Sequence, residues 1–140
     1  MISKNKAKFI ISLQRKKVRD EEGLFVIEGD KLIREFLAAK IPVNTLVAKA
    51  EFLSSLNADL TRSVNEIEEI SYEELKHIST LKTPHNALAI IPIPEREINT
   101  SEVLKQLCVA LDFVQDPGNL GTILRAAGWF GKIGRRHVGT

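Results

Sequence analysis

The chain has 140 residues, of which 44% are hydrophobic and 27% charged, and this composition is typical of a soluble globular protein. No segment approaches the ~18 continuous apolar residues of a membrane span, and the N-terminus lacks the apolar core of a secretory signal. One cysteine, Cys108, excludes an intramolecular disulfide framework. We therefore expect a cytoplasmic protein with no membrane partner.

The net charge of +2 conceals an uneven distribution along the chain. Residues 1–20 hold seven Lys and Arg against one acid, residues 21–124 nine against seventeen, and residues 125–140 four against none. A basic segment before an acidic body favours a nucleic-acid partner, because each neutralised phosphate releases a counterion; a solvated charged helix is the alternative. The candidate binding residues of this basic segment are Lys4, Lys6, Lys8, Arg15, Lys16, Lys17 and Arg19.

The first predicted elements are a helix, a strand and a second helix. Residues 4–19 have weak helical spacing of apolar side chains, which predicts a helix that is broken at residues 21–23. The apolar run 24–27 is rich in strand formers. Asp30 is predicted to cap a helix over residues 31–39, whose apolar side chains share one face.

The middle of the chain continues the alternation of strands and helices. Strands are predicted at residues 45–48 and 87–91, and a strand edge at residues 66–70. Helices are predicted at residues 50–56 and directly after Ser71, where a glutamate three positions later completes a capping box. Because strands and helices alternate, the first ~90 residues predict a small α/β/α sandwich.

The most informative stretch, residues 111–131, reads LDFVQDPGNLGTILRAAGWFG. Residues 108–114 form an almost continuous apolar run, which predicts an interior parallel strand with Cys108 buried on it. A turn that contains Asp116 and Gly118 follows. Because glycine has no side chain, we expect Gly118 to allow backbone φ angles that other residues rarely adopt. Open α/β sheets bind ligands outside the carboxyl ends of their strands, where this turn is expected to lie.

The predicted helix over residues 120–130 carries one arginine, Arg125, off its apolar face. Gly121, Arg125 and Gly128 share one stripe, so another backbone or a ligand could approach the guanidinium closely. Alternatively, Gly121 belongs to the turn and Gly128 only permits tight helix packing. Asn119 either caps this helix or presents its amide to a ligand.

Residues 113–127 closely resemble the first motif of the SpoU/TrmH family of RNA 2′-O-ribose methyltransferases, within the SPOUT superfamily. Residues 16–20 and 23–29 resemble the opening of the substrate-binding domain that precedes the catalytic domain in this family, and residues 87–91 resemble its closing strand. The resemblance implies an α/β fold. A small α/β/α ribosomal-protein-like RNA-binding domain would be followed by the first strand-loop-helix of a trefoil-knot methyltransferase domain.

Four parts of the chain follow from this resemblance. They are a basic N-terminal arm or helix (1–22), an RNA substrate-binding domain (23–92), a linker (93–103) and an incomplete SPOUT methyltransferase domain (104–140). The implied substrate is ribosomal or transfer RNA, the implied methyl donor is S-adenosylmethionine, and the implied assembly is a homodimer.

The resemblance also implies roles for individual residues of the motif. Arg125 would be the catalytic arginine that helps the ribose 2′-hydroxyl lose its proton, and Asn119 would shape the same site. An arginine side chain is normally locked as a cation, so its contribution is best framed as phosphate positioning and electrostatic stabilisation. The residues that would support the motif are Asp116, Gly118, Gly121 and Gly128.

In this family two further motifs form a C-terminal trefoil knot, and the methyl donor binds in the loops of that knot. Neither motif is found in this sequence. Residues 132–140 are basic and glycine-rich where the family has a second apolar strand, which indicates a truncation or a shifted reading frame. We expect the 140-residue chain to be inactive alone and to dimerise through residues 108–131. The alternative function is a non-catalytic RNA-binding module.

Other chemistries find less support in the sequence. His77, His85 and His137 have no ligand spacing with one another or with Cys108, so no metal site is expected. The glycines of the turn do not form a dinucleotide fingerprint, which argues against a dehydrogenase.

Overall fold

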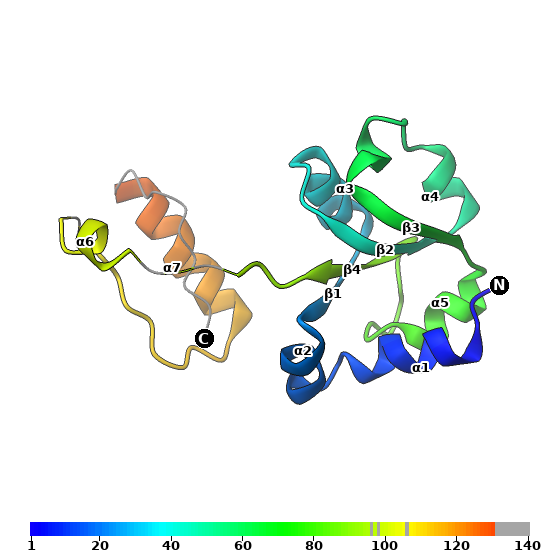
Figure 1. The fold of residues 1–140 in the computed structure, drawn as a ribbon, viewed down its shortest axis with the longest axis horizontal. Helices are drawn as coiled ribbons and strands as arrows, with labels where there is room; N and C mark the ends of the chain where they lie inside the picture. Colours follow the sequence, from blue (N-terminus) through cyan, green and yellow to red (C-terminus); the bar gives the residue numbers. More distant parts are fainter. Residues whose placement is uncertain (96, 98, 106, 131–140) are drawn as a thin grey trace. The chain divides into compact units, whose positions relative to one another are not determined.

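The computed structural model describes residues 1–95, 97, 99–105 and 107–130 (Figure 1). The chain divides into two units, Met1–Pro94 and Glu95–Thr140. Within the described residues, no helix is both long enough and apolar enough to span a membrane.

The first unit is built on a four-stranded mixed sheet with the order β1-β4-β2-β3. The central strand β4 (Ala87–Pro92) pairs antiparallel with β1 (Leu24–Glu28) and with β2 (Val43–Ala48), and β2 pairs in parallel with β3 (Val64–Glu69). Nearly every side chain of β2 and β4 is buried, as expected for interior strands that are covered on both faces. The edge strand β3 carries three glutamates, which discourage pairing with a further strand.

Two helices cover one face of the sheet, α3 (Asp30–Ala38) and α4 (Ala50–Ser54), and a 3₁₀ helix, η1 (Leu60–Ser63), leads into β3 (Figure 1). From these helices, Ile33 and Phe52 are buried against side chains of β1, β2 and β4. Burial of each such side chain stabilises the fold by roughly 1.5–3 kcal/mol.

Two further helices cover the opposite face, α1 (Lys4–Ser12) and α5 (Tyr72–Ile78) (Figure 1). Ile10 and Leu13 from the α1 segment, together with Leu75 from α5, are each 1% exposed and form a second core with β2 and β4. The predicted α/β/α sandwich is therefore confirmed, with one core on each face of the sheet.

The capping box predicted after Ser71 is confirmed at the start of α5. Ser71 Oγ accepts a hydrogen bond from the Glu74 backbone N–H at 3.3 Å, and Glu74 Oε2 accepts one from the Ser71 backbone N–H at 2.8 Å. The hydrogen bond from the Ser71 backbone lowers the pKa of Glu74.

The prediction of one helix through the basic segment is wrong, because the chain breaks after α1 and begins a second helix, α2 (Lys16–Glu22). Arg19 Nη1 donates to the carbonyl oxygens of Leu13 at 3.0 Å and Gln14 at 2.7 Å, which satisfies backbone acceptors at the break. The helix α2 ends at Gly23, whose φ of 64° is a left-handed conformation that favours glycine.

The prediction that Asp30 caps the following helix is also wrong. Asp30 is the first residue of α3, and the N-cap position belongs to Gly29 at a φ of 106°. The Asp30 carboxylate instead accepts hydrogen bonds from the backbone and side chain of Asn86, a residue 56 positions later. Sequence spacing could not reveal this long-range partner.

The second unit contains α6 (Thr100–Val103) and α7 (Pro117–Phe130) in its described part. The predicted strand over residues 108–114 is not formed, and Cys108 is exposed rather than buried. A strand needs a neighbour for its backbone groups, and the described part of this unit holds no second strand. Its helix is nevertheless present at the predicted place.

Candidate nucleic-acid interface

Lys6 joins α1 to the edge strand β3 through two ion pairs. Its Nζ lies 2.6 Å from Glu66 Oε1 and 2.9 Å from Glu68 Oε1, and its side chain is only 19% exposed. Burial lowers the pKa of Lys6, but the hydrogen bonds and charges of the two glutamates outweigh burial and raise it above the ordinary value. The hydrogen bond from Lys6 in turn lowers the pKa of Glu66.

Three more of the seven basic residues have partners within the chain. Arg19 binds backbone carbonyls at the break between α1 and α2. Lys16 Nζ lies 2.7 Å from Asp20 Oδ2 and Lys17 Nζ lies 3.7 Å from Glu21 Oε1. Both of these ion pairs are largely exposed, so each contributes little and leaves its lysine accessible to a polyanion.

The remaining three basic residues, Lys4, Lys8 and Arg15, are exposed and form no ion pair with any residue that the structure describes. At 100° per residue, Lys4 and Lys8 lie on one flank of α1, turned away from the buried Ile10. The structure thus separates basic side chains that hold the fold together from basic side chains that face solvent.

The loop between α5 and β4 (residues 79–86, the β4 loop) is held at both ends by carboxylates next to the β1–α3 turn. Glu28 Oε1 accepts from the backbone N–H of Thr80 at 2.9 Å and from its hydroxyl at 2.7 Å. Asp30 accepts from the backbone N–H of Asn86 at 3.0 Å and from its side-chain amide at 2.6 Å. The turn therefore fixes where the loop begins and where it ends.

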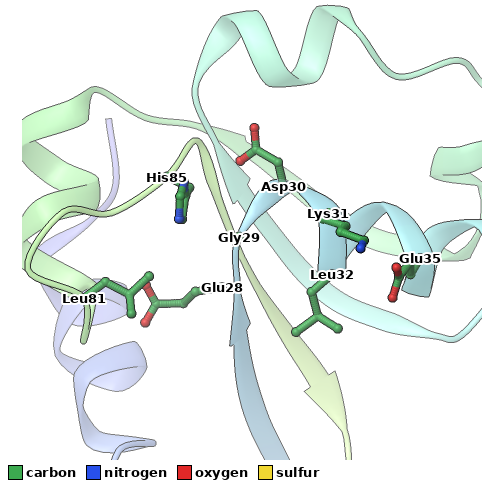
Figure 2. Close-up of a pocket in the computed structure, with 8 residues that line it drawn as sticks. All are labelled: Glu28, Gly29, Asp30, Lys31, Leu32, Glu35, Leu81 and His85. Atoms are coloured by element: carbon green, nitrogen blue, oxygen red, sulfur yellow. The ribbon is translucent and has the colours of Figure 1, made fainter.

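A pocket of about 610 Å³ lies between the β4 loop and the start of α3 (Figure 2). Gly29 lines this pocket beside the ring of His85, and its φ of 106° is a conformation that residues other than glycine rarely adopt. The sequence interpretation missed this pocket, and the available signals were the glycine and the turn-forming residues 83–86. The lining residues are Glu28, Gly29, Asp30, Lys31, Leu32, Glu35, Leu81 and His85.

In the second unit, Asp116 caps α7. Its Oδ2 accepts from the Asn119 backbone N–H at 2.7 Å, and its carbonyl accepts from the Leu120 N–H at 3.0 Å. Pro117 is the first helical residue, where a missing N–H breaks no helical hydrogen bond. A Cβ on Gly118 would lie 3.1 Å from Asp116 Oδ2, so close approach of the cap, rather than the predicted freedom from φ limits, explains this glycine.

The side chain of Arg125 folds back over Gly121. Its Nη1 lies 3.5 Å from the place where a Cβ on Gly121 would be, and its Nη2 donates to Thr122 Oγ1 at 3.3 Å. Gly121 therefore lies within α7, and the alternative that assigned it to the turn is wrong. The interpretation of Asn119 as the helix cap is also wrong, because its backbone N–H receives the cap of Asp116. A Cβ on Gly128 would meet nothing within 4 Å.

A nucleotide-like cofactor needs a pocket that buries most of its surface. None of the described side chains between residues 107 and 129 is buried, so Arg125 and Asn119 lie on an exposed helix. This segment alone therefore does not fit S-adenosylmethionine. Among the described residues, no group of three or more His, Cys, Asp or Glu could hold a metal ion, and His137 and residues 132–140 lie outside them.

The fold of the first unit and the motif on α7 together define the class, a substrate-binding domain followed by sequence of the SpoU/TrmH type. More particularly, residues 4–89 match the MRM3-like substrate binding domain, and the chain belongs to this family. The resemblance that the sequence carried is thereby confirmed.

Two curated relatives extend this result. The chain is 31% identical over 131 residues to rRNA methyltransferase 3, mitochondrial, of Xenopus laevis, a match that covers 89% of this chain and 31% of the relative. It is 30% identical over 115 residues to the 23S rRNA (guanosine(2553)-2′-O)-methyltransferase RlmP of Bacillus subtilis, covering 82% of this chain and 44% of the relative. The chain thus spans less than half the length of either relative.

Two solved structures of RNA methyltransferases are also similar to this chain. A Porphyromonas gingivalis protein assigned to the TrmH family of RNA methyltransferases has a TM-score of 0.72 and 36% identity, covering 94% of this chain and 50% of that one. The AdoMet-bound rRNA methyltransferase from Sinorhizobium meliloti has a TM-score of 0.62 and 25% identity, with the same coverage of both chains.

Proposed function

We propose that this chain is the RNA-binding part and first catalytic motif of an RNA ribose 2′-O-methyltransferase. The observation that carries the proposal is the succession of a matched substrate-binding domain and a capped α7 that bears Arg125 and Asn119. The name of the Bacillus subtilis relative supports the 2′-O reaction, and the AdoMet-bound neighbour supports S-adenosylmethionine as the donor. We place the parts at residues 1–22, 23–92, 93–103 and 104–140.

The proposed RNA interface of the first unit is formed by the solvent-facing basic side chains of α1 and α2. Lys4, Lys8 and Arg15 have no competing ion pair among the described residues, and Lys16 and Lys17 have only exposed ones. Lys6 and Arg19, predicted from the sequence as RNA contacts, are left out because both are engaged within the fold. Phosphate contacts of this kind supply affinity without sequence specificity.

The interface is tested by the salt dependence of RNA affinity, measured by fluorescence anisotropy with a labelled RNA. Each of K4A, K8A and R15A is expected to reduce the slope of log affinity against log salt by about 0.7–0.9. The control K40A removes an equal charge from a lysine that is paired with Asp59, and it should leave the slope unchanged. Equal losses in all four variants would overturn the proposed interface.

In the proposed enzyme, Arg125 stays a cation and Asn119 a neutral amide. We propose that Arg125 holds an RNA phosphate and stabilises charge that develops near the ribose 2′-hydroxyl. S-adenosylmethionine would supply the methyl group when bound. The exposure of Arg125 on α7 supports this role, because its guanidinium is accessible to a ligand. The other motif residues, Asp116, Gly118 and Gly128, are proposed to shape the helix that presents it.

The second candidate function is a non-catalytic RNA-binding module. It is favoured by the distribution of burial, since every buried side chain among the described residues belongs to the first unit. Isothermal titration of S-adenosylmethionine into the 140-residue chain tests whether this chain alone builds a cofactor site. We expect no saturable binding, because the segment around Arg125 is exposed. Saturable binding would show that this chain builds a cofactor site by itself.

We also propose that the chain self-associates through residues 108–131. Leu124 and Trp129 of α7 are 44% and 87% exposed, and apolar surface of this kind favours association. Sedimentation equilibrium tests this, and a strictly monomeric profile at high concentration would contradict it. A single cysteine suits a reducing compartment, which supports the cytoplasm as the proposed location.

A further inference from the structure

We propose that the pocket between the β4 loop and α3 binds an unpaired RNA base that carries an exocyclic amino group. The inference rests on the proposed RNA-binding function of the first unit and adds a recognition site to it. The basic residues of α1 and α2 explain affinity for the backbone, whereas this pocket would read a base.

The pocket has two apolar walls that no part of the described first unit covers. Leu32 on α3 is 40% exposed and Leu81 on the β4 loop is 41% exposed, and they lie on opposite sides of the Gly29 turn (Figure 2). The exposed ring of His85 lies beside Leu81 on the loop side. Proteins that recognise RNA sequence stack unpaired bases on rings such as histidine.

The lining carries one lysine, Lys31, and three carboxylates, Glu28, Asp30 and Glu35. Lys31 and Lys82 are exposed, come from the two elements that form the pocket, and make no ion pair with a described residue. Lys31 lines the pocket, and we expect it to contact a phosphate of the bound nucleotide. Two carboxylates in the lining, Glu28 and Asp30, are already occupied by hydrogen bonds from the β4 loop.

The carboxylate of Glu35 is the polar group left to read the edge of a base. It is exposed at the α3 side of the pocket and has no side-chain hydrogen bond with a described residue. A carboxylate accepts from an amino group such as N4 of cytosine. At the ring position of this amino group uracil carries the O4 carbonyl, which repels a carboxylate, so the pocket should prefer cytosine to uracil.

The β4 loop is organised for binding before RNA arrives. Hydrogen bonds from Thr80 to Glu28 and from Asn86 to Asp30 fix both of its ends to the turn that forms the pocket floor. A recognition loop that is already ordered loses less conformational entropy on binding.

The test compares two fluorescein-labelled decamers, oligocytidine and oligouridine, by anisotropy with the full chain. The two probes share a backbone and a ring size, so only the base edge differs. Wild type should bind oligocytidine about ten- to hundredfold more tightly, the ratio expected for one hydrogen bond to a charged acceptor. In E35Q the amide can also donate to uracil O4, so the ratio should fall to about one.

The matched control is E73Q, which removes an equal charge from an exposed glutamate on α5 and should keep the preference. H85A should weaken both probes together by roughly fivefold or more, the loss expected for one stacked base. Equal binding of the two decamers by wild type, or a preference that survives in E35Q, would overturn the base pocket and leave the phosphate interface standing. Failure of wild type to bind either decamer would overturn the proposed RNA binding itself.

Discussion

Lys6 and Lys8 are the same residue type two positions apart on α1, yet their side chains lie in different environments. Lys6 lies between Glu66 and Glu68 at 19% exposure, whereas Lys8 faces solvent. The difference arises because two positions on a helix turn a side chain through about 200°. The charge distribution predicted both lysines as nucleic-acid contacts. Only the side of α1 on which each one lies distinguishes the two.

The pairing of Lys6 predicts a pH-dependent loss of stability in K6M. The pKa of Glu66 is lowered in the folded state, so the stabilisation from this pair is present above the ordinary glutamate value and is lost as pH falls through the folded value. Urea unfolding should show K6M less stable than wild type at about pH 7, with a deficit that shrinks as pH falls below the ordinary glutamate value of 4.5. The control K8M should match wild type throughout this range, and a deficit of K6M that does not shrink would contradict the pairing.

The cap of α7 by Asp116 predicts a local effect of D116A. Loss of an N-cap costs about 1 kcal/mol of helix stability, which is roughly a fivefold change in an equilibrium. Amide hydrogen exchange of Leu120 and the following helical residues should accelerate by about this factor. D112A, which removes a carboxylate four residues earlier, is expected to leave exchange unchanged.

At the scale of elements, the basic helix α1 belongs to the core of the first unit. Ala7, Ile10 and Leu13 are buried against β2, β4 and α5, while the lysines occupy the rest of the helix. An amphipathic helix of this kind both stabilises the domain and presents charge. Residues 1–22 therefore hold two helices, of which α1 packs against the sheet and α2 has no buried residue.

This packing predicts that I10A destabilises the whole first unit. Ile10 is 1% exposed, and truncation of a buried isoleucine to alanine costs about 2–5 kcal/mol. Urea unfolding followed by circular dichroism should show a lower midpoint in I10A, whereas K8A should stay within about 0.5 kcal/mol of wild type. An unchanged midpoint in I10A would indicate that α1 does not contribute to the fold.

At the scale of the whole molecule, the two units differ in how much each buries. Met1–Pro94 holds both hydrophobic cores, and the described part of Glu95–Thr140 holds no buried side chain. Among the described residues, stability is therefore concentrated in the first unit, and the described part of the second unit has few buried contacts to resist local opening.

Limited trypsin digestion tests this division. Cleavage after Lys105 and Arg125, both exposed, should be rapid and should leave a resistant fragment that retains residues 1–94. Mass spectrometry identifies the fragments. Cleavage within α1 or α5 at the same rate would contradict a stable first unit.

The sequence by itself determined the local and alternating features of this protein. Apolar runs predicted β1, β2 and β4, although the run 108–114 forms no strand. The Ser71 pattern predicted its capping box, and the motif around Arg125 predicted the family, because each depends on residues that are close in the chain. These signals follow from helical and strand periodicity, which neighbouring residues carry.

Only the tertiary structure decided which partner each polar residue takes. Asp30 pairs with Asn86 in place of its expected cap, and Lys6 pairs with Glu66 in place of the predicted RNA contact. Cys108 is exposed, and no strand lies beside it in the described part of its unit. The physical reason is that hydrogen bonds, ion pairs and strand pairing join residues that are distant in sequence. Their formation depends on the folded arrangement, which the spacing of neighbouring residues does not predict.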